Sequence, residues 1–295
     1  MWIFLNDKFV RKEEALVSVF DHGFLYGDGI YETLRSYGPR LFMHPQHLAR
    51  LFRSAEAIGL TIPIHRERWP ELLHESMERN DVGTLEQDAY LRITVSRGVG
   101  GIGLDPGLCP SATIVILAQP LVAPAPALYD IGVDVMLATT RRNLPSALSP
   151  QIKSLNFLNN ILAKREALAA GAFDSLLLNW EGHLTEGTIS NLFFVTDGQL
   201  CTPSLACGLL DGITRSIVLQ LAKEQNITVA EGRFTPAQLY QSDESFVTNT
   251  SMEIMPVTSV DRKPIGDGKP GPITRKLREL FLGARERFLE PASSQ

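Results

Sequence analysis

The stretch SPQIKSLNFLNNILAKREALAAGAFD, residues 149–174, predicts a lysine just before an amphipathic helix. Lys153 lies between Ile152 and Leu155, and the helix is expected over residues 156–170. A lysine among apolar neighbours has a lowered pKa, and the neutral amine is the form that makes Schiff bases. The alternative interpretation is that Lys153 is a surface lysine whose aliphatic stem covers apolar neighbours. The expected helix carries an apolar stripe made of Phe157, Ile161, Leu162, Leu168 and Ala169.

A second signal is the acidic residue in GHLTEGTISNLFFV, residues 182–195. Glu186 and Gly187 interrupt an otherwise apolar hairpin meander that we expect over residues 175–200. A buried carboxylate must be paired or protonated, and a protonated pyridine nitrogen would be a suitable partner. An ordinary turn residue is the alternative.

A candidate anion site follows in LLDGITRSIVLQLAKE, residues 209–224. This segment predicts a helix over about residues 214–225, and the backbone N–H groups and dipole of a helix N-terminus attract anions. The residues at that N-terminus are Gly212, Ile213 and Thr214. Further backbone and hydroxyl donors come from Asn249, Thr250 and Ser251 in FVTNTSMEIMPV, and Arg50 could supply a counter-charge to a phosphate.

The length predicts two domains that share a cleft, because 295 residues exceed the roughly 100–200 usual for one domain. The segment PLVAPAPALYD is a stiff, extended linker by composition. We therefore expect a small N-terminal α/β domain over residues 1–119, a linker over 120–130 and a large domain over 131–295. Helices interspersed with antiparallel hairpins indicate an α/β or α+β fold in both.

Individual elements follow from periodicity and turn residues. In the first half we expect a hairpin over residues 2–10, an extended piece over 15–20, a glycine-punctuated strand after Asp21, helices over 45–58 and 66–80, and strands over 89–97 and 111–119. In the second half we expect a strand at 134–140, the helices and the meander described above, a strand at 245–249 and a C-terminal helix.

Composition limits the class of protein. The chain is 44% hydrophobic and 21% charged with a mean hydropathy of +0.01, which is typical of a globular protein. Its longest apolar run, residues 112–118, is far below the roughly 18 residues of a membrane span, and the N-terminus has no basic lead-in, so we expect a cytoplasmic protein. A net charge of -5 without a Lys/Arg block favours a small-molecule substrate over nucleic acid.

Three weaker patterns point elsewhere and are set aside. The literal GxGxxG at residues 98–103 is followed by two prolines, which exclude the helix of a dinucleotide fingerprint and favour a glycine-rich loop. His44 and His47 lack a third ligand, so we interpret them as a solvated helix end and expect no metal site. The three cysteines have neither disulfide nor zinc spacing.

Taken together, six segments resemble one family in order and spacing. They are FDHGFLYGDGIYETLR, HLARL, IKSLN, LTEGTISN, GITR and FVTNTSMEIMPV, and the resemblance runs from about Ile3 to the last helix. The chain is similar to the class IV, or fold-type IV, aminotransferases that depend on pyridoxal 5′-phosphate (PLP). Members include branched-chain L-amino-acid aminotransferases, D-amino-acid aminotransferases, R-selective amine transaminases and aminodeoxychorismate lyase.

The resemblance implies roles for particular residues and a homodimer or higher homo-oligomer. Lys153 looks like the catalytic Schiff-base lysine, Glu186 like the carboxylate that keeps the pyridine nitrogen protonated, and Leu210 like the residue packed on the ring. Arg50, Ile213, Thr214 and Thr250 resemble the phosphate cup, with Gly212 and Asn249 beside them. PLP would act as an electron sink and Lys153 as the group that moves a proton, with ping-pong kinetics.

Other residues distinguish between the branches of this family. Tyr90 and Arg92 are similar to the Tyr-x-Arg near the substrate carboxylate of branched-chain enzymes, and the following loop lacks the Arg and His of many D-specific enzymes. We therefore expect transfer from a branched-chain L-amino acid to 2-oxoglutarate. Tyr26 and Tyr31, expected on one strand, and Ser251 complete the predicted substrate site.

Three departures keep the alternatives open. The GTA turn of branched-chain enzymes is Asn249-Thr250-Ser251 here, IYETLR replaces their FEGIR, and Phe157 stands where a tyrosine is common. A D-amino-acid or R-amine transaminase, an aminodeoxychorismate-type lyase and a non-catalytic PLP-binding protein are the other hypotheses. Arg141 and Arg142 are candidates for the second carboxylate of 2-oxoglutarate, or else solvated loop charges.

Overall fold

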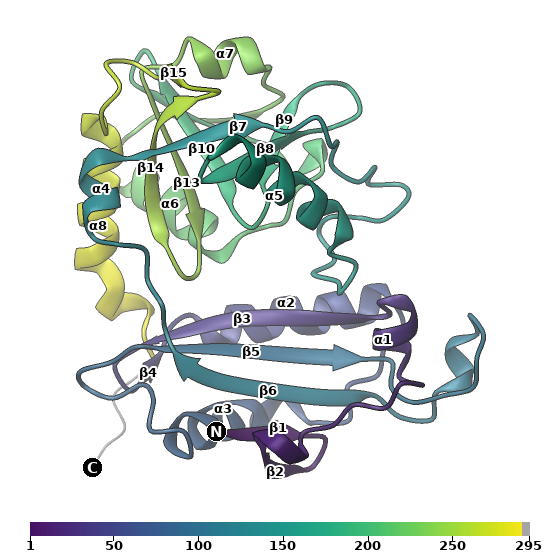
Figure 1. Ribbon diagram of the computed structural model, residues 1–295. Helices are drawn as coiled ribbons and strands as arrows, with labels where there is room; N and C mark the ends of the chain where they lie inside the picture. Colours follow the sequence, from purple (N-terminus) through teal and green to yellow (C-terminus); the bar gives the residue numbers. More distant parts are fainter. Residues whose placement is uncertain (291–295) are drawn as a thin grey trace. The chain divides into compact units, whose positions relative to one another are not determined.

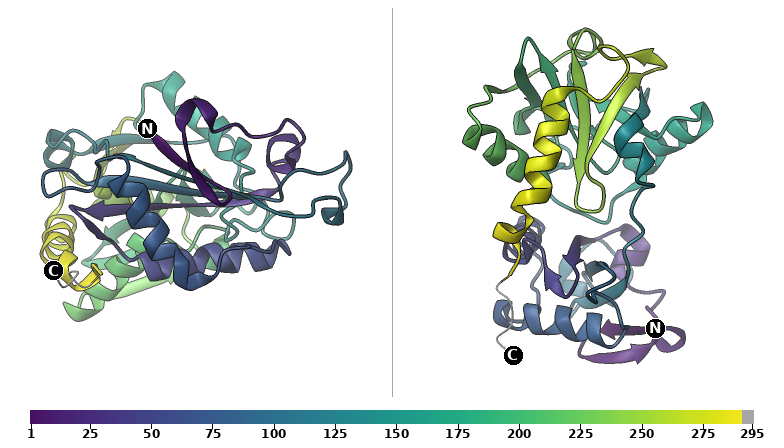
Figure 2. Two further views of the ribbon diagram at one scale, coloured as in Figure 1. Left: turned by 90° about the horizontal axis from the view of Figure 1, so that it is seen from below. Right: turned by 90° about the vertical axis from the view of Figure 1, so that its left-hand side faces the viewer.

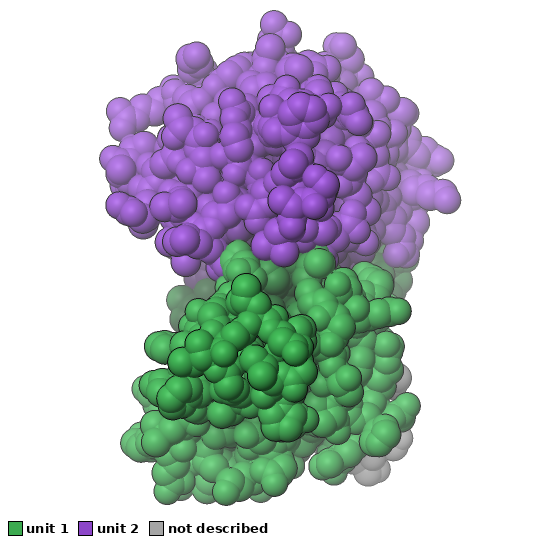
Figure 3. Space-filling view, turned by 90° about the vertical axis from the view of Figure 1, so that its right-hand side faces the viewer, with its two compact units in different colours: residues 1–122, 152–156, 287–295 green, residues 123–151, 157–286 purple. Residues whose placement is uncertain are grey.

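The computed structural model describes residues 1–290, and these form two compact units (Figure 3). Of the described residues, the first unit contains 1–122, 152–156 and 287–290, and the second contains 123–151 and 157–286. The last five residues of the predicted large domain lie outside the described part of the chain.

The first unit is built on a six-stranded antiparallel sheet with strand order β2-β1-β6-β5-β3-β4 (Figure 1). Alternating burial along β5 and β6 separates a core face from a half-exposed face, as a period of two requires. The expected opening hairpin is confirmed, because β1 and β2 pair antiparallel in the register Phe4 to Phe9. The strands are β1 Trp2–Leu5, β2 Lys8–Arg11, β3 Gly29–Tyr37, β4 Arg40–Leu41, β5 Ala89–Ser96 and β6 Thr113–Pro120.

Two helices cover the core face of this sheet. They are α2 His44–Ala57 and α3 Trp69–Glu78, and the short helix α1 His22–Tyr26 precedes β3. Leu51 and Trp69 are fully buried against sheet residues such as Leu91. Gly59 follows α2 in the left-handed conformation (φ 58°), which confirms the predicted helix end. Residues 15–20, expected to be extended, form no strand; they lie between the 3-10 turn Lys12–Glu14 and helix α1.

The second unit contains a nine-stranded sheet that closes on itself. Its order is β12-β11-β10-β13-β14-β7-β8-β9 with β15 beside β14, and an additional β9–β10 pairing joins six of these strands into a ring. The interior is filled by Leu176, Leu192 and Met255. The strands are β7 Val133–Leu137, β8 Asp174–Leu178, β9 Leu184–Gly187, β10 Asn191–Thr196, β11 Gln199–Pro203, β12 Val229–Gly232, β13 Glu244–Asn249, β14 Glu253–Val260 and β15 Lys263–Pro264.

Five helices accompany these strands: α4 Ala127–Ile131, α5 Leu158–Ala170, α6 Ile213–Glu224, α7 Pro236–Tyr240 and α8 Pro272–Phe288. In Figure 2 the long helix α8 runs beside the strands of the second unit, and Glu244 on β13 accepts hydrogen bonds from the backbone N–H groups of Ile273 and Thr274 in its first turn. Among residues 1–290, no helix has the length and apolar character needed to cross a bilayer.

Three sequence predictions differ from this fold. The predicted linker is not wholly extended, because α4 lies at its end. The domains are not two continuous segments, because residues 152–156 hydrogen-bond to β3 and therefore belong to the first unit. The apolar stripe of α5 is not its buried side: Asn160, Ala163 and Ala167 are buried, whereas Ile161 and Leu168 are 49% and 66% exposed.

Candidate active site

Lys153 lies in a short extended segment that docks on the start of β3. The Tyr31 N–H donates to the Lys153 carbonyl (2.9 Å), and the Leu155 N–H donates to the Gly29 carbonyl (2.9 Å). The Lys153 N–H in turn donates to Ser54 Oγ on α2 (3.2 Å). The backbone of this lysine is thus held from two sides within the first unit.

The Lys153 side chain lies against an aromatic ring. Its Nζ is 4.5 Å from the ring centroid of Tyr31, and the guanidinium carbon of Arg92 is 4.1 Å from the same centroid. Arg92 is opposite Thr33, the second residue after Tyr31 on β3, so the two groups share the half-exposed face of the sheet. Burial raises the pKa of the Tyr31 phenol, which stays protonated near neutral pH. The Lys153 amine and the Arg92 guanidinium therefore both lie against the ring of one neutral phenol.

A buried ionic cluster lies on the opposite face of β3. Glu32 is fully buried and pairs with Arg50 through Oε1 to Nε (2.6 Å) and Oε2 to Nη2 (2.9 Å). His47 Nδ1 is 2.9 Å from the same Oε2. Burial opposes ionisation of Glu32, but the Arg50 charge and the hydrogen bonds from His47 and Arg50 hold its pKa well below the usual range. Burial lowers the pKa of His47, so its neutral imidazole donates to the carboxylate.

Glu186 is one of the buried carboxylates of the second unit. It lies in β9, and its Oε1 is 2.7 Å from Arg142 Nε while its Oε2 accepts from the Leu210 N–H (3.0 Å). Arg142 also donates to Asn159 Oδ1 on α5 (3.1 Å). The turn-residue alternative for Glu186 is therefore wrong. Arg142 is 9% exposed, so the alternative of a solvated loop charge is wrong for that residue as well.

The N-terminus of α6 has the form expected for an anion site. Gly212 is its N-cap residue, and no side chain of the described chain caps the first turn, which contains Ile213 and Thr214. A Cβ added at Gly212 would lie 1.9 Å from Asn191 Oδ1. Asn191 is itself fixed by its Nδ2–H, which donates to the Leu210 carbonyl (2.9 Å). Glycine is therefore required at this position, because any Cβ would collide with Asn191.

The turn between β13 and β14 contains the remaining predicted donors. Asn249 Oδ1 accepts hydrogen bonds from the N–H groups of Ser251 (2.9 Å) and Met252 (2.8 Å). This side chain therefore occupies the N–H of Ser251, one of the donors that the sequence predicted for an anion, and that of the next residue, Met252. Next to it, the Thr248 hydroxyl is buried and has no hydrogen-bond partner among the described residues.

Several predicted positions fall elsewhere in the fold. Tyr26 ends α1 instead of lying on a strand, and its hydroxyl accepts from the Gly103 N–H (3.1 Å). Tyr90 lies on β5, as expected, and its hydroxyl is 3.5 Å from Thr33 Oγ1. His47 is not a solvated helix end but a buried partner of Glu32.

Sequence reasoning missed three members of these clusters. Glu32 and His47 were not assigned to any site, and Arg142 was not connected to Glu186. A usable signal existed for the first pair, because His47 and Arg50 are three residues apart and share a helix face that a buried carboxylate can bridge. The Arg142 pairing has no sequence signal, because loop residues bring it to β9.

Comparisons with known proteins agree with this geometry. The family model "Amino-transferase class IV" matches residues 29–260. A "Putative branched-chain-amino-acid aminotransferase" of Methanocaldococcus jannaschii is 42% identical over 98% of this chain and 98% of its own length. A D-alanine aminotransferase of Listeria monocytogenes is 35% identical over 96% of this chain and 95% of its own length.

Solved structures show the same similarity. The branched-chain amino acid aminotransferase of Escherichia coli matches with a TM-score of 0.93 at 31% identity, covering 98% of each chain. The T.th. branched-chain amino acid aminotransferase with pyridoxamine 5′-phosphate also matches with a TM-score of 0.93, at 33% identity over 98% of this chain and 97% of that one.

The protein is therefore a mixed helix and strand enzyme with the fold-type IV architecture. It belongs to the class IV aminotransferases, as the resemblance in its sequence indicated.

Proposed function

We propose that this chain is a PLP-dependent transaminase that moves the amino group of a small branched-chain L-amino acid to 2-oxoglutarate by a ping-pong mechanism. The observation that carries the proposal is the buried Glu186 carboxylate, paired with Arg142 in a chain of the class IV family. Such a carboxylate is suited to hold a proton on a pyridine nitrogen. The branched-chain names of the similar proteins support the substrate class.

The residues of the second unit fit the cofactor. An ionised carboxylate has about four acceptor positions, and Arg142 and Leu210 supply two donors, so Glu186 can accept one more from a pyridinium. Gly212 has no Cβ to collide with Asn191 Oδ1, so α6 can begin here with the uncapped N-terminus at which a phosphate is favoured. The Thr248 hydroxyl, which lacks a partner in the described chain, is a further buried polar group at the neighbouring turn.

Each residue then has a defined task. PLP supplies, when bound, an aldehyde that condenses with amines and a ring that withdraws electrons. Lys153 would provide the amine that forms the Schiff base and later hold or release a proton at Nζ. Glu186 would keep the ring nitrogen protonated, and Leu210 would pack on the ring. The phosphate would be bound by Gly212, Ile213, Thr214, Asn249 and Thr250, whereas Arg50, also predicted for this role, lies in the first unit and is paired with Glu32.

We assign the substrate carboxylate to the half-exposed face of the first sheet. Arg92 forms no ion pair within residues 1–290, and it is stacked on Tyr31 close to Lys153 Nζ. A guanidinium on a rigid aromatic ring is well placed to bind a carboxylate. Tyr90 would assist Arg92, and Tyr26, Tyr31 and Ser251 would line the rest of the site.

A D-amino-acid or R-amine transaminase is the second candidate, and one observation favours it. The glycine of a GTA turn has no side chain, whereas Asn249 here occupies the N–H groups of Ser251 and Met252. Those two donors cannot bind a substrate carboxylate without displacing Asn249. The turn thus differs in hydrogen bonding from the turn that the resemblance describes for branched-chain enzymes.

Half-reactions distinguish these candidates. Purified holoenzyme is mixed separately with L-leucine, D-alanine and R-1-phenylethylamine, and the loss of the visible Schiff-base absorbance is followed. Fast conversion with L-leucine alone supports the first proposal, whereas conversion with D-alanine or the amine alone assigns the enzyme to the second. Lys153→Ala should lack both the absorbance band and turnover; retention of either contradicts the role of Lys153.

We also propose that the chain forms a homodimer. Two sets of exposed apolar residues support this: Leu16, Val19, Phe20, Phe24, Ile102 and Leu104 in the first unit, and Leu158, Ile161, Leu162 and Leu168 on α5. A second copy is the expected partner because closed homo-oligomers are the commonest soluble assemblies. Analytical ultracentrifugation of wild type and Phe24→Glu tests this; a monomeric wild type overturns it.

A further inference from the structure

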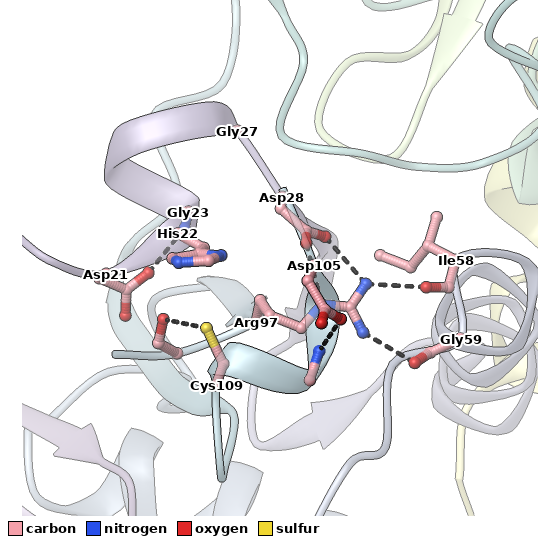
Figure 4. Close-up of polar contacts among 12 residues, drawn as sticks. Asp21, His22, Gly23, Gly27, Asp28, Ile58, Gly59, Arg97, Asp105 and Cys109 are labelled. Atoms are coloured by element: carbon pink, nitrogen blue, oxygen red, sulfur yellow. Dashed lines mark hydrogen bonds and ion pairs between the residues drawn. The ribbon is translucent and has the colours of Figure 1, made fainter. Parts of the chain in front are cut away.

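The Arg97 side chain donates four hydrogen bonds within the first unit. Its Nε and one Nη2–H donate to the two oxygens of Asp28 (2.9 and 3.0 Å), as Figure 4 shows. The guanidinium also donates to the carbonyls of Ile58 and Gly59 (both 2.7 Å). The side chain is only 7% exposed, so these contacts are shielded from water.

We call the contacts of Arg97 with Asp28, Ile58 and Gly59 the Arg97 clamp. Its Asp28 side is connected through β3 to residues 152–156, the lysine segment. The Arg97 N–H donates to the Asp28 carbonyl (2.9 Å), and the next residue, Gly29, accepts the hydrogen bond from the Leu155 N–H. A Cβ at Gly29 would lie 2.7 Å from both Leu155 Cδ1 and the Val95 carbonyl oxygen. The absence of a side chain at Gly29 therefore lets the lysine segment approach β3 closely.

The other side of the clamp is the C-terminal end of α2. Ile58 and Gly59 are the two residues after this helix, and Ser54, one turn earlier, accepts the hydrogen bond from the Lys153 N–H. Arg97 therefore links the two elements, β3 and α2, that hold the backbone of Lys153. The linkage forms a closed ring of contacts within one compact unit.

From this arrangement we propose that Arg97, together with Asp28, is a positioning residue for Lys153. It holds the start of β3 against the end of α2, and so fixes where the lysine amine lies relative to the Tyr31 ring. Arg97 touches neither the lysine side chain nor the groups assigned to substrate. The inference rests on the proposed function, because it gives a consequence to the position of Lys153 only if that residue forms the Schiff base.

The physical reason is the sensitivity of bond formation to distance. A shift of about 1 Å in a reacting group can slow a reaction by roughly a hundredfold, whereas non-covalent binding of the same molecule tolerates such a shift. Loss of the clamp should therefore slow Schiff-base formation more than it weakens cofactor binding.

Two variants and one matched control test this. Arg97→Gln removes the clamp, and Asp28→Asn removes its ionic half without changing side-chain volume. Asp88→Asn is the control, because Asp88 pairs with Arg35 in the same unit and is similarly exposed, 32% against 27% for Asp28. Two quantities are measured on the apoprotein: the growth rate of the Schiff-base band after PLP is added, and the dissociation constant of pyridoxamine 5′-phosphate, which cannot react with Lys153.

We expect the Schiff-base band to grow about tenfold or more slowly in Arg97→Gln than in wild type, with a smaller effect in Asp28→Asn. The dissociation constant of pyridoxamine 5′-phosphate should be unchanged in both variants. The control Asp88→Asn should equal wild type in both quantities. If Arg97→Gln does not fold, the same two quantities are compared between Asp28→Asn and Asp88→Asn, and this comparison tests the proposal. Equal loss of both quantities, or equal behaviour of the two aspartate variants, overturns the proposal. If Lys153→Ala lacks the band but Arg97→Gln forms it at the normal rate, only the positioning role of Arg97 is refuted. If Lys153→Ala still forms the band, the proposed function is refuted.

Discussion

Arg142 Nε lies 2.7 Å from Glu186 Oε1, and both side chains are less than a tenth exposed. The pair joins the loop after β7 to the short strand β9, and Asn159 fixes the other side of the guanidinium. A buried carboxylate with a fixed cation beside it keeps its negative charge and its direction. Its remaining acceptor positions are then available to a ligand.

This pairing gives the first prediction. Arg142→Met leaves the Glu186 charge buried without its cation, and we expect unfolding free energy to fall by roughly 3–5 kcal/mol. The double variant Arg142→Met, Glu186→Leu should recover much of this loss, because neither charge remains, yet it should not transaminate. Urea unfolding of the apoproteins measures the free energy of unfolding of wild type and of each variant. Additive losses in the double variant would show that the two residues are not coupled.

A second prediction concerns Glu32 on the opposite face of β3 from the lysine site. Glu32→Gln removes the anion from Arg50, which is 5% exposed, so we expect a loss of roughly 3–5 kcal/mol of stability. Asp88→Asn breaks a more exposed ion pair and should lose only about 0–1 kcal/mol. Chemical denaturation measures the free energy of unfolding of both variants. Similar losses in the two would contradict the expectation that burial makes the Glu32 pair the more costly one to break.

Gly212 provides a third prediction. Gly212→Ala places a Cβ 1.9 Å from Asn191 Oδ1, so Asn191 must move and the N-terminus of α6 must distort. We expect weaker binding of PLP, with much less effect on pyridoxal, which has no phosphate. Gly283→Ala is the control, because nothing lies within 4 Å of its added Cβ in α8, and it should stabilise the protein by about 0.5–1 kcal/mol. Equal weakening of both ligands would exclude an effect through the phosphate.

The fourth prediction concerns pH. Glu166 accepts hydrogen bonds from the N–H groups of Thr139 (2.6 Å) and Thr140 (3.0 Å) and from both hydroxyls. Burial opposes ionisation, but these hydrogen bonds dominate and lower the pKa of Glu166 from 4.5 to about 2. A lowered folded-state pKa stabilises the fold above the unfolded pKa, and this contribution is lost as pH falls from about 4.5 towards 2.

Unfolding measured at several pH values checks this expectation. The stability difference between wild type and Glu166→Gln should be constant above about pH 5 and should shrink towards pH 3. Thr140→Val removes one hydroxyl donor and should give an intermediate difference. A difference that grows as the pH falls would contradict the sign of the shift.

Local elements were predictable where local chemistry decides them. The hairpin of β1 and β2, the end of α2 at Gly59 and the start of α6 at Gly212 follow from periodicity and turn residues, and the structure confirms each. Residues 15–20 are apolar enough to suggest a strand, but they pair with no other strand. Hydrophobicity alone cannot distinguish a strand from an exposed apolar surface.

Partners distant in sequence were not predictable. His47 looked like a solvated helix end because the sequence does not show that β3 presents Glu32 to that helix face. The stripe on α5 looked like a core face, whereas small residues on its other side allow close packing against β8. In both cases burial is a property of the assembled layers and not of the helix.

The order and spacing of the six motif segments were sufficient, by themselves, to identify the family, because a lysine, a carboxylate and an anion-binding helix end in that order are local chemical features. Which groups contact one another was decided only by the tertiary structure. Arg142 reaches Glu186, Arg97 clamps Asp28 to the end of α2, and Asn249 closes its own turn. These contacts depend on distances between segments far apart in the chain, and such distances are fixed when sheets close and helices pack on them.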